Sequence, residues 1–313
     1  MKSLTRTYAS AVCERLCVAA CPILNPGDNK QVLEPESKSV EQLLIGEYHT
    51  SYLGHDTNAA QRQESSSGGL LTWLLIRLLE EKIIDGVITT VASDDPGKEL
   101  FKFDILRTPD ALRKASGSKY YPVEASEVIK QVMRDKSDDT YAILGVPCLL
   151  QGVNIAKQKY KRLDKKIRFS FSLVCGQLPN AAYTELLSGC AGLNEDEIGT
   201  VDYRNKENTT SASNFVFVPE DKSGKKGRPL YWIEQPSYLW ENSFFIHTAC
   251  KFCDDLYGRT ADAVFMDAWL PGISQKPEGH SLVVIRDPEI DAVFQQGRLP
   301  GSARSRPLAS TRC

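Results

Sequence analysis

Cysteine is the residue type with the most distinctive chemistry in this sequence, and the 313-residue chain contains nine of them. Cys13, Cys17 and Cys21 are evenly spaced near the N-terminus, and Cys250 and Cys253 form a C-x-x-C pair. An odd number of cysteines in a chain without an export signal argues against a framework of disulfides. Both groupings are typical of metal or iron–sulfur ligands instead.

A scattered cysteine such as Cys190 is better explained as a small buried apolar side chain. Cys148 and Cys175 differ, because each lies where the chain leaves a predicted strand, at residues 141–145 and 167–174. Ligands bind at the carboxyl edge of open parallel sheets. If both strands belong to one sheet, the two thiols reach the same edge, and the C-x-x-C pair could complete a set of four. Four thiolates suit either a 4Fe-4S cluster or a zinc ion, and spacing alone leaves both open.

A second candidate site lies at the start of a predicted helix. Apolar residues within positions 70–79 follow helical spacing, and residues 65–69 before them read Ser-Ser-Ser-Gly-Gly. The glycines permit close approach of the backbone, the serines supply hydroxyl donors, and a helix N-terminus favours an anion. The segment therefore predicts either a phosphate-binding helix end or ordinary helix capping.

Composition narrows the class of protein. Charged residues make up 25% of the chain and the formal net charge is −2, so nothing indicates nucleic acid as a partner. The longest apolar run, residues 70–79, is interrupted by Arg77 and is about half as long as a membrane span. Residues 1–22 lack the uninterrupted apolar core of a signal peptide. We therefore expect a cytoplasmic protein without a membrane span.

The chain divides into three predicted regions. Residues 1–42 hold the N-terminal cysteine segment and a polar linker, and residues 43–294 alternate strand and helix patterns. Residues 295–313 are rich in Gly, Pro, Ser and Arg, and we expect them to be disordered. The middle region predicts an α/β fold, with a mixed or parallel sheet flanked by helices.

The middle region also carries an ordered set of motifs that resembles the coenzyme F420 hydrogenase/dehydrogenase beta-subunit family. The set runs from about residue 50 to about residue 290 and comprises Ser66-Ser67-Gly68-Gly69, Ile84-Asp85-Gly86-Val87, Gly117-Ser118-Lys119-Tyr120, Gly145-Val146-Pro147-Cys148, Cys175-Gly176, and Cys250 and Cys253 followed by Ala261-Asp262 and Asp267-Ala268-Trp269-Leu270-Pro271. The resemblance implies a flavoprotein that uses FAD and 4Fe-4S clusters and passes electrons between a cluster and the flavin. It also implies coenzyme F420 or another small organic molecule as a substrate. The implied partner is a redox protein, either ferredoxin-like or a hydrogenase or dehydrogenase subunit.

The resemblance also implies roles for particular residues. The implied flavin-binding residues are Ser66, Ser67, Gly68, Gly69 and Thr72 from the first motif, Ser118, Lys119 and Tyr120 from a second stretch, and Asp267, before which Met266 replaces the family's usual glycine. Lys119 is the implied catalytic residue, because a lysine beside the isoalloxazine would stabilise negative charge on the reduced ring. The implied ligands of the 4Fe-4S cluster are Cys148, Cys175, Cys250 and Cys253.

The N-terminal cysteines depart from the family's ferredoxin-type C-x2-C-x2-C-x3-C-P pattern. Cys17 and Cys21 fit its last part, Cys13 is one residue out of register, and Ala11 stands at the first ligand position. A complete site needs four thiolates, so we expect these three weaker candidates to form a degenerate or labile site rather than an intact second cluster. Two other functions stay open: a zinc-stabilised, non-catalytic binding protein, and a degenerate family member that acts as a partner subunit.

Overall fold

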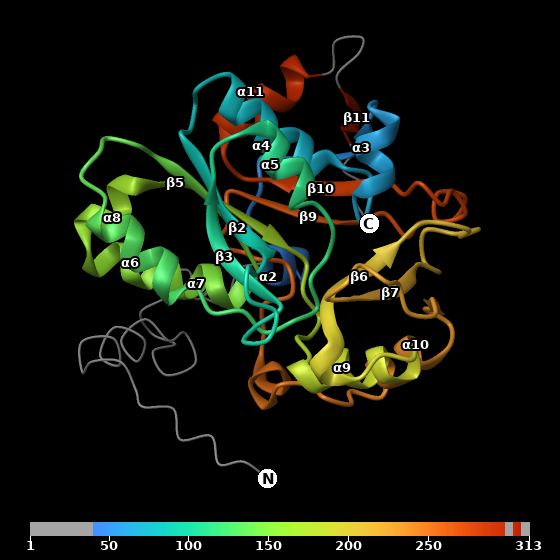
Figure 1. Cartoon of the computed structure of the whole chain (residues 1–313). Coiled ribbons are helices and arrows are strands. Elements are labelled where there is room, and N and C mark those ends of the chain that lie inside the picture. The colour runs from blue at the N-terminus through green and yellow to red at the C-terminus, as the bar shows by residue number, and fades with distance from the viewer. Residues whose placement is uncertain (1–39, 298–302, 308–313) are drawn as a thin grey trace.

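The structure is a computed structural model that describes residues 40–297 and 303–307. Its largest element is an eight-stranded sheet with the strand order β11-β1-β10-β9-β5-β4-β2-β3 (Figure 1). The strands are β1 (Thr50–Asp56), β2 (Gly86–Ala92), β3 (Phe101–Leu106), β4 (Tyr141–Gly145), β5 (Ile167–Leu173), β9 (Ala263–Asp267), β10 (Ser281–Ile285) and β11 (Ala303–Pro307). The weaker ligand candidates Cys13, Cys17 and Cys21 lie outside the described residues.

The large sheet is mixed, which confirms the predicted α/β class. Strands β2, β4, β5 and β9 pair in parallel, whereas β3 and β10 run against them and β1 runs against β10. Because β10 is antiparallel to both β9 and β1, β1 runs in the same direction as the four central strands. The carboxyl ends of β1, β9, β5 and β4 therefore meet at one edge of the sheet.

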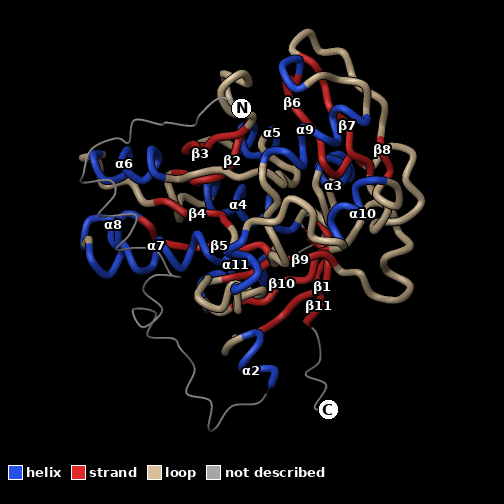
Figure 2. Tube along the Cα trace, turned by 90° about the horizontal axis from the view of Figure 1, so that it is seen from below, coloured by secondary structure: helices blue, strands red, loops and turns tan. Residues whose placement is uncertain are grey.

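Helices cover both faces of this sheet (Figures 1 and 2). The described helices are α2 (Val40–Ile45), α3 (Ala59–Glu64), α4 (Leu70–Glu80), α5 (Pro109–Lys114), α6 (Ser126–Arg134), α7 (Pro147–Lys159), α8 (Lys161–Lys166), α9 (Ala181–Cys190), α10 (Gln235–Glu241) and α11 (Pro288–Gln296), with short 3-10 turns at Glu195–Glu197 and Thr248–Phe252. Of these, α9 and α10 lie beside the small sheet described below. Side chains alternate along β4: Ala142 joins the core under α4 and α11, whereas Tyr141 and Ile143 join the core under α6, α7 and α8. The helix expected from residue 70 is α4, whose apolar side is fully buried.

A second, smaller sheet was not foreseen from the sequence. It contains β6 (Ile198–Asn205), β7 (Val216–Asp221) and β8 (Leu230–Tyr231), which pair antiparallel. With α9 it encloses a core rich in aromatic side chains, among them Tyr183, Tyr203 and Phe217. Its strands are short and its register is interrupted by irregularities, so the alternation that marks a strand is weak in this part of the sequence.

The C-terminal region differs from the disorder expected for residues 295–313. Gln295 and Gln296 complete α11, and β11 pairs antiparallel with β1 along the sheet edge. Backbone pairing needs no apolar side chains, so the polar composition that predicted disorder does not exclude an edge strand. Among residues 40–297 and 303–307, no helix combines the length and apolar character that a membrane span requires.

Candidate functional site

The candidate ligands Cys148 and Cys175 lie at the common carboxyl edge of the central strands. Cys148 is in the first turn of α7, directly after β4, where Pro147 occupies a first-turn position that needs no backbone N–H donor. Cys175 follows β5 by two residues, and its backbone N–H donates to the carbonyl of Leu256 at 3.1 Å. Because β4 and β5 are adjacent parallel strands, the two thiols reach one place, as the sequence predicted.

Cys250 and Cys253 are brought to the same place by a loop. The Cys250 backbone N–H donates to His247 and the Cys253 backbone N–H donates to Cys250, which forms a tight turn around the C-x-x-C pair. This loop runs beside the chain that follows Cys175, because the Leu178 backbone N–H donates to Cys250 Sγ at 3.4 Å. This contact places Cys250 beside the segment that follows Cys175.

Neighbouring thiols contribute to the raised pKa values of Cys148 and Cys175. Burial raises the pKa of Cys175 to about 12, and the nearby thiols Cys148, Cys250 and Cys253 act in the same direction. Burial also raises the pKa of Cys148, again with Cys253 and Cys250 contributing. Cysteines from three separate segments are therefore close enough to influence one another, and a bound cation would favour their thiolate forms.

A buried carboxylate holds the C-x-x-C loop against α7. Asp255 is 1% exposed and accepts a hydrogen bond from Gln151 Nε2 at 2.9 Å, so it links the loop after Cys253 to the helix that begins at Cys148. The Arg259 backbone N–H donates to both Asp255 oxygens at 3.2 Å. Asp255 therefore links the segment that contains Cys253 to the helix that contains Cys148.

The second candidate site lies at the carboxyl end of β1 and the start of α4. Gly69 adopts a left-handed conformation with φ of 84°, which favours glycine, and it caps α4. Gly68 packs against the protein's own backbone: a Cβ there would lie 2.6 Å from Ser281 N and 2.8 Å from Gly54 O. The Ser67 hydroxyl donates to the carbonyl of His280 at 2.6 Å. Much of this loop is thus shaped by contacts with β1 and β10.

The two stretches that the sequence assigned to flavin meet in space. Ser118 Oγ donates to Ser66 Oγ at 2.8 Å. Burial raises the pKa of Tyr120, and its neighbours Arg204 and Ser118 act in the opposite direction. Arg204 makes a two-pronged ion pair with Asp267, with Nη1–Oδ2 at 2.8 Å and Nη2–Oδ1 at 3.1 Å. Ser66, Ser118, Tyr120 and Asp267 therefore belong to one polar network, with Arg204 as its centre. Thr72 lies half-buried in the first turn of α4.

Lys119, the implied catalytic residue, is held by backbone carbonyls. Its ammonium donates to the carbonyls of Ala115, Ser116 and Gly117, the last two at 2.9 and 2.8 Å. Burial lowers the pKa of Lys119 to about 8, partly offset by Asp202. An ammonium has three N–H donors, so all three are used in capping the turn after α5.

Sequence reasoning missed two buried basic residues at the end of β6. Arg204 is 7% exposed, with its guanidinium 4.4 Å from the ring centre of Phe215 and 5.9 Å from that of Trp269. Lys206 Nζ donates to the carbonyls of Arg62, Ser67 and Glu278 at 2.7 to 2.8 Å, which ties three loops together. The signal was present as the run Tyr203-Arg204-Asn205-Lys206, in which bases interrupt a strand pattern that predicts burial.

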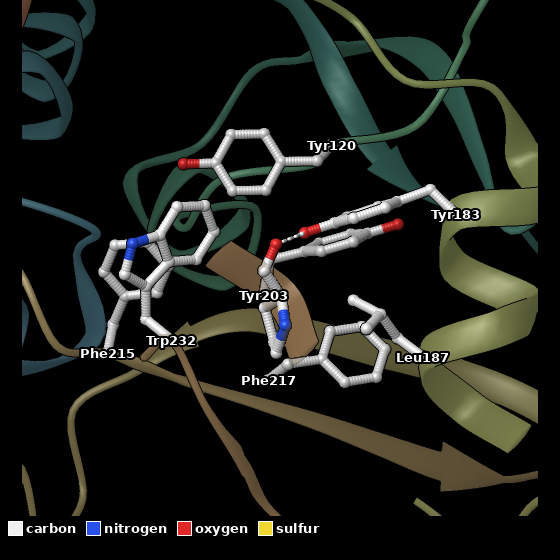
Figure 3. A pocket seen from close by; sticks show the side chains of 8 residues that line it. Tyr120, Tyr183, Leu187, Tyr203, Phe215, Phe217 and Trp232 are labelled. Atoms are coloured by element: carbon white, nitrogen blue, oxygen red, sulfur yellow. Dashed lines mark hydrogen bonds between the residues drawn. The ribbon is translucent and has the colours of Figure 1, made fainter. Parts of the chain in front are cut away.

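A small cavity lined mostly by aromatic side chains adjoins this network (Figure 3). It is formed by Tyr120, Tyr183, Leu187, Tyr203, Phe215, Phe217, Trp232 and Pro236. Tyr120 faces Phe215 and Trp232 across it, and its ring lies 4.9 Å from that of Trp240, measured between centres. Tyr120 thus connects the polar network around Arg204 with the aromatic core of the small sheet.

The fold is that of an α/β protein with four neighbouring cysteines and a serine- and glycine-rich loop at one edge of its large sheet. Two parts of the chain match the family described as coenzyme F420 hydrogenase/dehydrogenase, beta subunit: residues 51–130 match its N-terminal part and residues 138–310 match its C-terminal part. The chain belongs to the coenzyme F420 hydrogenase/dehydrogenase beta-subunit family, as its motifs indicated.

Individual relatives agree with this membership. The chain is 24% identical over 275 residues to the coenzyme F420 hydrogenase subunit beta of Methanothermobacter thermautotrophicus, covering 85% of this chain and 87% of the relative. It is 27% identical over 262 residues to the protein of that name from Methanococcus voltae, covering 80% and 82%. A chain in the F420-reducing [NiFe] hydrogenase complex from Methanosarcina barkeri has a similar fold, with a TM-score of 0.63, 20% identity, and coverage of 86% of this chain and 85% of that chain.

The chemistry of both sites fits the groups that the family implies. Within residues 40–297, no three His, Cys, Asp or Glu side chains form a group that could hold a single metal ion as they stand. A 4Fe-4S cluster takes one thiolate at each of four irons, and Cys148, Cys175, Cys250 and Cys253 supply that type and number of donors. In the other site, the buried Nε of Arg204 has no hydrogen-bond partner among the described residues. Such a donor fits a ligand that offers a carbonyl or ring nitrogen, as a flavin does.

Proposed function

We propose that this chain is a flavin- and iron–sulfur-dependent oxidoreductase subunit, which holds a 4Fe-4S cluster at Cys148, Cys175, Cys250 and Cys253 and FAD at the network around Ser66. The observation that carries the proposal is the position of both sites on one sheet edge. Asp267 ends β9 and Cys175 follows β5, and these two strands are neighbours, joined beyond their ladder by a 3.0 Å bond from Val174 N to Phe265 O. Electron transfer between a cluster and a flavin requires such proximity.

The chain's own residues bind and orient the two groups. When bound, the cluster exchanges single electrons and the flavin converts these into paired electrons for an organic substrate. The four thiolates would hold the irons. The Leu178 N–H group donates to Cys250 Sγ, and Asp255 links the loop after Cys253 to α7. The Ser66 hydroxyl, held by Ser118, would donate to the flavin, the Tyr120 hydroxyl would lie beside it, and Asp267 would act through Arg204.

The names of the relatives support a proposal for the substrate and the partner. We propose coenzyme F420, or another small organic molecule of similar redox chemistry, as the substrate, because the relatives from Methanothermobacter thermautotrophicus and Methanococcus voltae are named as F420 hydrogenase beta subunits. We propose a redox protein as the partner, because a chain of similar fold occurs in a hydrogenase complex. Phe252, between two of the cluster ligands, is 79% exposed and offers apolar surface for such contact beside the cluster.

Anaerobic purification followed by one absorption spectrum and assays of iron, sulfide and FAD tests the proposal. Flavin bands with a broad iron–sulfur shoulder, and iron and sulfide near four per chain, are the expected result. A colourless protein that contains zinc would contradict it in favour of a non-catalytic binding protein. A colourless protein without metal, even after reconstitution with iron and sulfide, would identify a degenerate partner subunit. Reduction of coenzyme F420 by the coloured protein with an artificial electron donor tests the substrate separately.

A further inference from the structure

Arg204 is the most unusual side chain near the proposed flavin site. Its guanidinium is buried, both terminal nitrogens bond to Asp267, and its Nε is buried without a hydrogen-bond partner among the described residues. Burying a donor without an acceptor is costly, and native proteins rarely do it without a reason. An acceptor from outside the chain would remove that cost.

The surroundings of Arg204 hold it rigidly and place it against the flavin-binding stretches. The rings of Phe215 and Trp269 lie 4.4 and 5.9 Å from the guanidinium carbon, which restricts its rotation. Tyr120 lies close enough to Arg204 and to Ser118 for both to affect its pKa, and Ser118 donates to Ser66 ahead of α4. Arg204 is therefore next to Tyr120 of the second flavin stretch, and two side chains separate it from Ser66 of the first.

Lys119 is a weaker candidate for a cation that faces the ring. Its three donors are occupied by backbone carbonyls of residues 115–117, so contact with a ligand would require breaking one of these bonds. Burial acts to lower the pKa of Arg204, but Asp267 and Tyr120 outweigh it and raise the pKa above its ordinary value. Arg204 thus keeps its charge and also has a free donor.

We propose that Arg204, rather than Lys119, is the cation that contacts the isoalloxazine of FAD, with Nε donating to an acceptor on the ring. In this position Arg204 stabilises the negative charge that the ring gains on reduction, and Asp267 moderates the effect by neutralising part of the cation's field. The inference rests on the proposed function, because it requires that the chain bind FAD.

Flavin midpoint potentials of the full-length protein loaded with FAD test this role. Arg204→Met should weaken the binding of reduced relative to oxidised FAD by at least about tenfold, which lowers the two-electron midpoint by about 30 mV. Asp267→Asn should shift the midpoint in the opposite direction, because it leaves the cation without its counter-charge. Arg204→Lys, which keeps the charge, should lie between Arg204→Met and the wild type.

Opposite shifts distinguish a charge that acts on the flavin from an ion pair that only stabilises the fold. Lys166→Met is the matched control, because Lys166 forms a buried ion pair with Asp135 outside this network, at 2.8 Å. It should leave the midpoint unchanged. Shifts of the same sign in Arg204→Met and Asp267→Asn, or a fall in the midpoint with Lys119→Met but not with Arg204→Met, would overturn the inference.

Two further outcomes have defined meanings. If Arg204→Met does not fold, Asp267→Asn decides alone: a raised midpoint supports the inference, and an unchanged or lowered one rejects it. If the wild-type chain neither contains nor binds FAD, both the proposed function and this inference fail. A wild type that binds FAD while the variants show no opposite shifts removes only the role of Arg204.

Discussion

At the scale of single residues, the proposed cluster site depends on thiols whose positions are set by backbone hydrogen bonds. Cys250 lies in a turn that also receives the Leu178 N–H group, and Cys253 closes the same turn. Cys190 provides a contrast, because it is the last residue of α9 and packs against the aromatic core of the small sheet. The three thiols are chemically alike, so their environments must distinguish their roles.

Substituting either cysteine of the C-x-x-C pair should therefore remove iron. In Cys250→Ser and Cys253→Ser, a hydroxyl replaces the soft thiolate that iron–sulfur clusters require. We expect most of the iron and of the broad visible absorption to be lost, measured by iron assay and absorption spectroscopy after anaerobic purification. Cys190→Ser should retain wild-type iron. Equal iron in all four proteins would show that the ligands are elsewhere.

His280 should make the free energy of unfolding depend on pH in the acidic range. Burial lowers its pKa to about 4, with contributions from Arg62, His55 and Lys276, and Arg62 Nη2 lies 3.3 Å from its Nδ1. The folded state therefore prefers neutral His280, whereas the unfolded chain takes up the proton near the ordinary value of 6.5. As the pH falls from 6.5 towards 4, the free energy of unfolding should decrease.

Urea unfolding of wild type and His280→Gln, measured across this pH window, checks the effect. Glutamine can still accept a hydrogen bond from Arg62 but does not titrate, so the stability of His280→Gln should decrease less on acidification. Parallel pH profiles for the two proteins would assign the acid sensitivity to other groups.

Motif order in the sequence identified most of the residues in the candidate sites, but it could not identify their partners. Ser66, Ser118, Tyr120 and Asp267 were named separately, and the structure joins them in one network through Arg204. Arg204 lies in a different sheet from Asp267, so no local spacing connects the two. Residues joined only by tertiary contacts are the ones that a single sequence does not reveal.

At the scale of elements, two residues at the junction between β1 and α4 differ in role. Gly68 serves the packing of the fold, whereas Ser66 serves the proposed cofactor site. The Ser-Gly-Gly stretch predicted close backbone approach, and at Gly68 the approaching atoms belong to β1 and to the start of β10. The Ser66 hydroxyl, by contrast, is bonded to the hydroxyl of Ser118, which belongs to the other flavin stretch. The two residues should therefore respond differently to substitution.

Gly68→Ala should destabilise the protein whether or not FAD is present. The new Cβ would lie 2.6 Å from a backbone nitrogen that cannot move freely, and overpacking of this kind costs about 2 kcal/mol. Ser66→Ala should cost about 1 kcal/mol, the value of one hydrogen bond, but should reduce the FAD retained on purification. Urea unfolding of the FAD-free proteins measures the first effect and flavin content the second. Wild-type stability for FAD-free Gly68→Ala would mean that the glycine serves the cofactor.

The larger elements were predicted from the sequence with unequal success. A long run of apolar residues at helical spacing predicted α4, and short apolar runs followed by turns predicted β4 and β5. The small sheet escaped prediction because β8 has only two residues and the register of β6 shifts twice. Edge strand β11 escaped because backbone pairing, not side-chain pattern, defines it.

At the scale of the whole molecule, the residues proposed for the two sites all follow the N-terminal cysteine segment in the sequence. All four core thiols and the network around Arg204 lie within residues 66–267, and the described chain begins with α2 at Val40. Helix α2 is fixed by its own contacts, since Arg259 and Arg286 donate to the carbonyls of Leu43 and Ile45. A deletion that ends before α2 should leave these contacts intact.

Deleting residues 1–30 should therefore change neither cofactor content nor flavin chemistry. The deletion removes Cys13, Cys17 and Cys21, which offer three thiolates where a ferredoxin-type cluster uses four. We expect wild-type iron per chain, wild-type FAD per chain, and an unchanged rate of flavin reduction by an artificial donor. Loss of about half the iron would instead show that the three thiolates, with a fourth ligand from elsewhere, hold a second cluster. In that case Glu14→Gln in the full-length chain should also lower the iron content, because Glu14 is the nearest alternative donor in the sequence.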